Sequence, residues 1–148
     1  MIFKISQDQA YEVAKLAVEM WQDNTIETLT EELKDIIKDD NNAIFGYKQD
    51  NQIVAFCQVQ LRFDYVEGTE YSPVAYLEGI FVKQNYRRQG IARMLVEYAE
   101  KWARNKNIKE FASDCEITNL ESFEFHKKLG FIETNRIICF TKKLKVNV

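Results

Sequence analysis

The stretch from residue 74 to residue 105 constrains the fold more than any other part of this chain. Val74 to Val82 is a nearly continuous apolar run, which predicts a central strand that is covered on both faces. Its single charged residue is Glu78. After a short loop, apolar residues recur every three or four positions from Gly90 to Asn105, which predicts an amphipathic helix of about four turns. The sequence therefore places the start of a helix beside the end of a buried strand.

The residues at this predicted helix start favour an anion-binding site. They read Arg87-Arg88-Gln89-Gly90-Ile91-Ala92. A helix start presents about four N–H groups without helical partners and a partial positive charge, and small residues let an oxygen-rich anion approach the backbone. A Walker loop would also need a lysine and a hydroxyl, which this stretch lacks. The sequence predicts a pyrophosphate site built mainly from main-chain N–H groups; the alternative is a solvated turn without a ligand.

Other patterns predict the rest of the fold. Ser6-x-x-Gln9 and Thr28-x-x-Glu31 resemble capping boxes, which predict one helix through Trp21 and a second helix that starts at Thr28. Alternating or β-branched segments predict strands at 2–5, 43–48, 52–63 and 110–114, and a final strand pair or one long bent strand over 131–144. A further periodic segment, 119–129, predicts a helix that is ended by a glycine. We expect one α/β domain over residues 1–148, a mixed and mostly antiparallel sheet with helices on both faces.

The composition excludes several function classes. The chain has 148 residues and a formal net charge of −3, which favours a cationic partner over nucleic acid. No run of about 18 apolar residues and no signal peptide occurs, so we expect no membrane span and a cytoplasmic location. Cys57, Cys115 and Cys139 lie far apart among apolar neighbours, which favours buried thiols over a catalytic cysteine. With a single histidine and no Cys/His cluster, we expect no metal.

Two motifs together resemble the GNAT family of acetyl-CoA-dependent N-acetyltransferases. Arg87-x-x-Gly90-x-Ala92 resembles the acetyl-CoA motif of the family, and residues 119–131 resemble its second motif, in the usual order and spacing. The resemblance implies a V-shaped splay between the strand that ends at Val82 and the strand 110–114, with the pantetheine arm of acetyl-CoA bonded to main-chain groups there. The residues implied in cofactor binding are Ile80, Phe81, Val82, Arg87, Arg88, Gln89, Gly90, Ile91, Ala92, Arg93, Asn119, Ser122 and His126.

His126 departs from the family pattern, in which many members place a tyrosine that protonates the leaving thiolate. A histidine can donate this proton, because its reference pKa of about 6.5 leaves a charged fraction near neutrality. A neutral hydrogen-bonding or packing role is the alternative.

A narrower resemblance, over residues 63–82, 102–103 and 110–114, is to the chromosomal aminoglycoside 6′-N-acetyltransferases of bacteria. It implies acetylation of an aminoglycoside, resistance to these antibiotics, an aromatic wall at Trp21 and Tyr65, and a homodimer formed through the strand 136–144. Aminoglycosides are polycations, and carboxylates cluster in the loops and strand ends that are expected near the splay. These carboxylates are Asp64, Glu67, Glu70, Glu78, Asp114 and Glu116.

Glu78 and Asp114 are the candidate proton acceptors. Acetyl transfer needs a neutral amine, and an alkylammonium with a reference pKa of about 10.4 is almost fully charged at pH 7. A nearby carboxylate can take the proton, directly or through water. Asp114 can instead hold the ring that carries the amine, and Glu78 can instead be a structural partner of Arg62.

Two other functions stay open. The same enzyme class can act on a polyamine, an amino sugar or a peptide N-terminus, or the domain can bind acyl-CoA without turnover.

Overall fold

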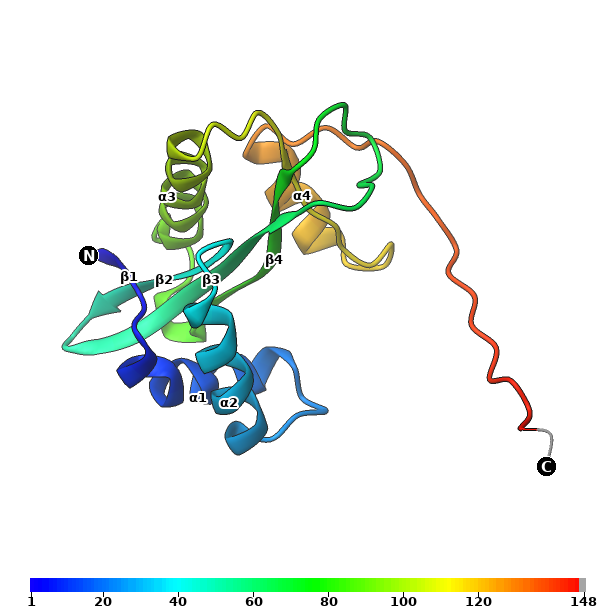
Figure 1. Cartoon of the computed structure of the whole chain (residues 1–148). Helices are drawn as coiled ribbons and strands as arrows, with labels where there is room; N and C mark the ends of the chain where they lie inside the picture. Colours follow the sequence, from blue (N-terminus) through cyan, green and yellow to red (C-terminus); the bar gives the residue numbers. More distant parts are fainter. Residues whose placement is uncertain (147–148) are drawn as a thin grey trace. The chain divides into compact units, whose positions relative to one another are not determined.

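The computed structural model describes residues 1–146, and the chain divides into two compact units, residues 1–114 and the part that begins at Cys115. Figure 1 shows the elements of both units. The first unit contains, in chain order, β1 (Ile2–Lys4), η1 (Gln7–Gln9), α1 (Ala10–Met20), α2 (Ile26–Lys38), β2 (Asn42–Gln49), β3 (Gln52–Arg62), β4 (Val74–Val82), η2 (Gln84–Tyr86), α3 (Ile91–Asn105) and β5 (Phe111–Ala112). The second unit contains α4 (Leu120–Lys128).

The sheet of the first unit has the strand order β1-β2-β3-β4-β5. The first four strands pair antiparallel, and β5 pairs parallel with β4. Asp50 and Asn51 join β2 to β3 with positive φ angles of 51° and 60°, as a tight hairpin turn requires. The prediction of a mixed, mostly antiparallel sheet is therefore confirmed.

Helices cover both faces of this sheet. On one face, α1 and α2 pack on Ile44 and Phe56, which are fully buried. On the other face lies α3, where the ring of Phe45 is 5.0 Å from that of Tyr98. Figure 1 shows α3 on the opposite side of the strands from α1 and α2. Because Ile44 and Phe45 are neighbours in one strand, their side chains point to opposite faces, and each supplies a different core layer.

The starts of the helices follow local capping chemistry. The main-chain N–H of Ser6 donates to Oε1 of Gln9 over 3.0 Å, so the first predicted capping box is confirmed. The predicted start of the second helix is wrong by one turn: α2 begins at Ile26, because the hydroxyl of Thr25 accepts from the N–H of Thr28 over 3.1 Å. Two threonines compete for the cap, and Thr25 is the one with an extended backbone.

The predictions for the last third of the chain are partly wrong. The strand expected over 110–114 is reduced to the two residues of β5. The strands expected over 131–144 are absent from the described residues, which form no sheet beyond Ala112. A strand exists only where a neighbouring strand accepts its ladder bonds, and alternating apolar residues alone do not supply this neighbour.

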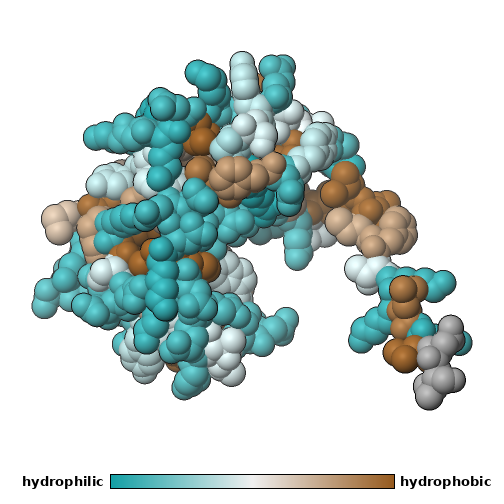
Figure 2. Space-filling model, in the orientation of Figure 1, coloured by the Kyte–Doolittle hydropathy of each residue, from teal (hydrophilic) through white to brown (hydrophobic). Residues whose placement is uncertain are grey.

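The second unit exposes much of its apolar surface. Figure 2 shows apolar side chains along the C-terminal segment. In residues 131–146, the large apolar side chains with at least 70% exposure are Ile132, Ile137, Ile138, Phe140, Leu144 and Val146.

Candidate active site

The strand β4 has one paired edge and one edge that opens after its first residues. On the open side, β5 pairs with β4 only at Ala75 and Tyr76. From residue 77 to residue 82, no strand of the described residues pairs with this edge. This geometry agrees with the splay that the family resemblance implies, and it leaves main-chain groups available to a ligand.

The backbone alternation places Ile80 and Val82 toward this open edge. The N–H of Lys83 donates to the carbonyl of Val54 over 2.8 Å, so Lys83 and the residues two and four before it face β3, while Ile80 and Val82 face away. The carbonyl of Val82 already accepts from Nε of Arg87 over 2.8 Å. Arg87 thus stabilises the end of the strand. The carbonyl of Val82 was expected to be free for a ligand, and it is already hydrogen-bonded.

The start of α3 fits an anion. Gly90 caps the helix with a positive φ of 78°, and Arg88 before it has a φ of 64°. A Cβ built on Gly90 would meet no heavy atom within 4 Å, so open space lies over the first turn. Ile91 is buried, which fixes the helix on the sheet, while Arg88 and Gln89 are exposed. N–H groups without helical partners therefore face an accessible space, as the diphosphate of acetyl-CoA requires.

Glu78 lies at an irregularity of β4. Gln58 of β3 pairs with Gly79, but the next residue, Val59, pairs with Leu77, so Glu78 is an extra residue opposite this pair. Such a β-bulge bends the strand and re-aims the side chain. The bulge directs a carboxylate into a cavity at the point where β4 leaves β5.

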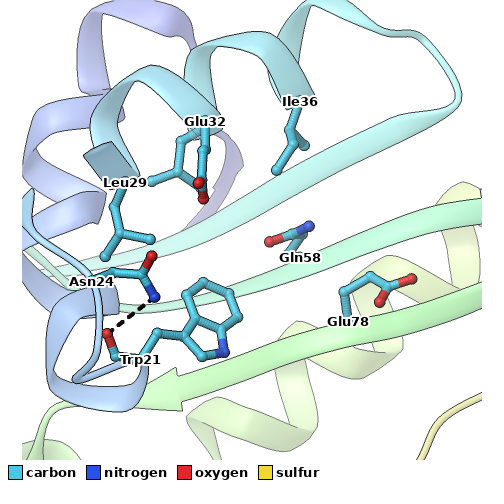
Figure 3. A pocket seen from close by; sticks show the side chains of 8 residues that line it. Trp21, Asn24, Leu29, Glu32, Ile36, Gln58 and Glu78 are labelled. Atoms are coloured by element: carbon cyan, nitrogen blue, oxygen red, sulfur yellow. Dashed lines mark hydrogen bonds between the residues drawn. The ribbon is translucent and has the colours of Figure 1, made fainter. Parts of the chain in front are cut away.

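A cavity of about 320 Å³ lies between α2 and the bulge. Figure 3 shows its side chains, with Trp21, Gln58 and Glu78 on the side of the sheet and Glu32 and Ile36 on the side of α2. The residues that line it are Trp21, Asn24, Leu29, Glu32, Leu33, Ile36, Gln58 and Glu78. Two predicted site residues, Trp21 and Glu78, are thus brought together.

Gly79 allows the indole of Trp21 to reach the cavity. A Cβ on Gly79 would lie 2.8 Å from Cζ2 of Trp21, closer than real contacts allow. The indole also makes an edge contact with the ring of Phe56, with centroids 6.2 Å apart. The ring is therefore held between a glycine of β4 and a core aromatic, as a rigid wall.

Arg62 and Tyr76 connect the two candidate carboxylates. Arg62 donates to both oxygens of Glu78, over 2.8 and 2.7 Å, and its guanidinium lies 3.4 Å from the ring centroid of Tyr76. These hydrogen bonds raise the pKa of Arg62. The hydroxyl of Tyr76 donates to Oδ2 of Asp114, and burial, then this hydrogen bond, raise the pKa of Tyr76. The pairing of Glu78 with Arg62, one of the two alternatives for Glu78, is present.

Tyr65 is not brought to the cavity. It lies on the loop between β3 and β4 with 78% exposure, and its hydroxyl donates to Glu67 over 3.2 Å. The loop is held at its far end by Glu110, whose Oε1 accepts from the N–H groups of Glu70 and Tyr71 over 2.8 Å each.

Three predicted residues, Asn119, Ser122 and His126, belong to the second unit. Asn119 caps α4, because its side chain accepts from the N–H of Ser122 over 3.1 Å. Nδ1 of His126 donates to the carbonyl of Ser122 over 2.7 Å, and its ring packs edge-on against Phe125 and Phe131. These contacts fix the orientation of the imidazole ring within its own unit.

Sequence reasoning missed Gln58, Asn24 and Glu32 as cavity residues. For Gln58 a signal existed: it is the one polar residue in the run from Ile53 to Val59, whose other members are apolar. Asn24 and Glu32 carried no such signal, since polar residues are ordinary in a connection and on an exposed helix face.

The cysteines differ from the prediction. Cys57 is buried, and burial raises its pKa to about 12, so it is a neutral thiol. Cys115 and Cys139 are exposed, which corrects the expectation that all three are buried.

Among residues 1–146, no group of three or more His, Cys, Asp or Glu could hold a metal ion. No helix in this range has the length and apolar character to cross a membrane.

A sheet that splays beside a glycine-capped helix start, with a carboxylate at the bulge, defines an acetyltransferase-like site. The model of the Acetyltransferase (GNAT) family matches residues 8–131, and the chain belongs to this family.

Two relatives indicate which acetyltransferases of the family this chain is similar to. The chain is similar to the aminoglycoside N(6′)-acetyltransferase type 1 of Serratia marcescens, with 39% identity over 87% of this chain and 89% of the relative. It is 38% identical to the enzyme of the same name from Acinetobacter baumannii, over 97% and 98% of the two chains.

Solved structures of aminoglycoside 6′-N-acetyltransferases are similar to this chain in fold as well. An apo aminoglycoside 6′-N-acetyltransferase from Acinetobacter haemolyticus matches with a TM-score of 0.91 and 34% identity, over 98% of this chain and 99% of that one. AAC(6′)-Iy in complex with the bisubstrate analogue CoA-S-monomethyl-acetylneamine matches with a TM-score of 0.92 and 31% identity, over 97% and 98%.

Proposed function

We propose that this chain is an acetyl-CoA-dependent aminoglycoside 6′-N-acetyltransferase, and that this activity confers resistance to these antibiotics. The observation that carries this proposal is the carboxylate of Glu78, which lies in a walled cavity next to the open edge of β4. The names of the relatives support the amine acceptor, and the cationic charge of aminoglycosides suits a cavity with two carboxylates, Glu32 and Glu78.

The cofactor is proposed to lie along the open edge. Main-chain N–H groups of residues 88–93 would hold its diphosphate, and the groups of Ile80 and the N–H of Val82 would hold its pantetheine arm. When bound, acetyl-CoA supplies an acetyl thioester. Of the two N–H groups expected to polarise the thioester oxygen, that of Phe81 faces β3, so we propose an N–H at the open edge near Val82 for this role.

Glu78 is proposed to remove the proton of the amine. Without help, the neutral amine at pH 7 costs about 4 to 5 kcal/mol. Each oxygen of Glu78 accepts one hydrogen bond from Arg62, so each keeps a second lone pair for an ammonium group or a water. Its side chain is 17% exposed, so the charge is mostly shielded from bulk water without being sealed off. In this arrangement Glu78 can accept a proton while it stays paired with Arg62.

Asp114, Trp21 and Tyr65 are proposed to bind the substrate, and His126 to protonate the leaving thiolate. Asp114 is held by the hydroxyl of Tyr76 and is otherwise exposed, which suits a contact with an ammonium group. For His126, the donation from Nδ1 to Ser122 orients the ring, which is what a proton donor needs. Residues 1–148 are proposed to act as one domain, since the family match spans both units.

We also propose a homodimer formed through residues 136–144. The apolar side chains exposed on this segment would be stabilised if the segment joined the sheet of a second copy. Light scattering should give twice the mass of the chain, and a variant truncated after Asn135 should be a monomer. A monomeric full-length chain would refute this proposal.

A cytoplasmic location fits the proposed activity, because acetyl-CoA is produced there.

A thiol-release assay tests the proposed function. Acetyl-CoA is supplied with kanamycin, tobramycin, spermidine or a peptide with a free N-terminus. We expect kcat/KM for the aminoglycosides to exceed that for spermidine and the peptide by at least about 100-fold, since buried polar groups discriminate strongly. Preference for spermidine or the peptide would establish another acceptor, and tight acetyl-CoA binding without turnover would establish a binding module.

A further inference from the structure

We infer that Gln58 reads a hydroxyl group of the substrate ring that carries the reactive amine, and thereby sets substrate specificity. The inference rests on the proposed function and adds a recognition residue to the same cavity. Gln58 comes from the middle of β3, where its neighbours Cys57 and Val59 are fully buried.

The burial and the bonding of Gln58 carry the inference. The residue is only 8% exposed, so its amide is largely removed from bulk water. Among the described residues, no hydrogen bond involves its side chain, yet none of its polar atoms is sealed from solvent. A buried amide without a partner is unfavourable unless water or a ligand fills the site. The amide therefore faces the cavity with both its donor and its acceptor available.

The neighbours of Gln58 place this amide beside the reaction. Its Cα pairs with that of Gly79, which follows Glu78 at the bulge, and Gly79 contacts the indole of Trp21. Figure 3 shows the amide between the indole and the carboxylate. A sugar ring stacked on Trp21, with its amine at Glu78, would present a neighbouring substituent to Gln58.

The chemistry selects a hydroxyl as this substituent. An ammonium group would be drawn to Glu78 or Glu32, the charged groups of the cavity. A neutral amide instead matches a group that donates one hydrogen bond and accepts another, and a hydroxyl does both. Loss of such a pair leaves a buried polar group unpaired, which is why hydrogen-bonded sites discriminate strongly.

The test compares two substrates and matched variants. Kanamycin B and dibekacin differ in two hydroxyls, which dibekacin lacks, on the ring that carries the reactive amine. Gln58→Leu removes the amide, Gln58→Met does so with an unbranched side chain, and Gln49→Leu makes the same change on β2, outside the residues that line the cavity.

We expect wild type and Gln49→Leu to prefer kanamycin B. Gln58→Leu and Gln58→Met should lower kcat/KM for kanamycin B about tenfold, mainly through KM, and bring the ratio of the two substrates close to one. The melting temperatures of these two variants should not fall, because an unpaired amide is replaced by an apolar group. Their KM for acetyl-CoA should not rise.

Three outcomes would overturn the inference. The first is equal use of both substrates by the wild type. The second is a substrate ratio that either folded Gln58 variant leaves unchanged. The third is a wild type that acetylates neither compound, and only this third outcome also refutes the proposed function.

Discussion

Arg62 shows how one residue can organise a site without reacting. Its fork fixes both oxygens of Glu78, and its flat face lies on Tyr76, whose hydroxyl holds Asp114. The orientations of two carboxylates, Glu78 on β4 and Asp114 after β5, thus depend on one guanidinium. A lysine offers a point charge without the planar fork and cannot replace this geometry.

Substitution of Arg62 should therefore affect turnover more than stability. We expect Arg62→Met to lower kcat by about tenfold or more, because the base loses its orientation. The free energy of unfolding should change by no more than about 1 kcal/mol, since the guanidinium is partly exposed and solvent screens the pair. Steady-state kinetics and urea unfolding measure both quantities. As a control, Arg62→Lys should recover only part of kcat; full recovery would mean that charge alone matters.

Tyr76 predicts an alkaline sensitivity. Burial and the bond to Asp114 raise its pKa in the folded protein above the ordinary value of 10.0. The unfolded chain therefore ionises first, so this stabilising contribution is complete below about pH 10 and falls as the pH rises further. We expect Tyr76→Phe to lose less stability than wild type between about pH 9 and about pH 11, as measured by urea unfolding. Equal losses in both proteins would contradict the buried, bonded hydroxyl.

At the scale of elements, the site is a set of strand and helix ends brought together. Its parts are the bulge of β4, Trp21 directly after the end of α1, and the glycine-capped start of α3. Glycines are needed at two of these positions, at Gly79 for a close approach and at Gly90 for a positive φ angle.

Gly79 permits the approach of α1 to β4. Gly79→Ala places a methyl group 2.8 Å from Cζ2 of Trp21, and neither the strand nor the indole can yield easily. We expect a loss of about 1 to 3 kcal/mol in stability and a higher KM for the aminoglycoside, with the KM for acetyl-CoA unchanged. Thermal unfolding measures the loss of stability, and steady-state kinetics measure the two KM values. An unchanged KM for the aminoglycoside would mean that Trp21 does not bind the substrate.

Gly90 keeps the start of α3 open. Its φ of 78° suits glycine, and asparagine is the side chain that tolerates this region best. Gly90→Asn should therefore fold but raise the Kd of acetyl-CoA by about tenfold or more, because its side chain enters the space over the first turn. Calorimetric titration gives the Kd. Unchanged affinity in a folded variant would place the diphosphate elsewhere.

Local signals predicted these elements well. The apolar run of β4 and the periodicity of α3 depend on neighbours in sequence, and both predictions are confirmed. The start of α2 was missed because Thr25 and Thr28 both suit a cap, and the sequence does not show which threonine has the extended backbone of an N-cap. The bulge at Glu78 had no local signal, since it arises from the register with β3.

At the scale of the whole molecule, non-local pairing limited the predictions. β5 pairs with β4 only at Ala75 and Tyr76, and residues 131–146 pair with no strand of the described residues. Of the residues that the sequence predicted for the site, Trp21 and Glu78 line one cavity, and the predicted helix start is present at Gly90; their roles stay predictions. It missed Gln58 as a cavity residue, because only the folded sheet places this amide beside Glu78.

Turnover by a Glu78→Gln variant tests the central claim most directly. The thiol-release assay with kanamycin should show a fall in kcat/KM of about 100-fold or more, while calorimetry gives an unchanged Kd for acetyl-CoA. Glu100→Gln, which alters a carboxylate paired with Arg104 on α3, should behave as wild type. If Glu78→Gln retains wild-type turnover, then the carboxylate at the bulge does not take the proton, and the proposed mechanism is wrong.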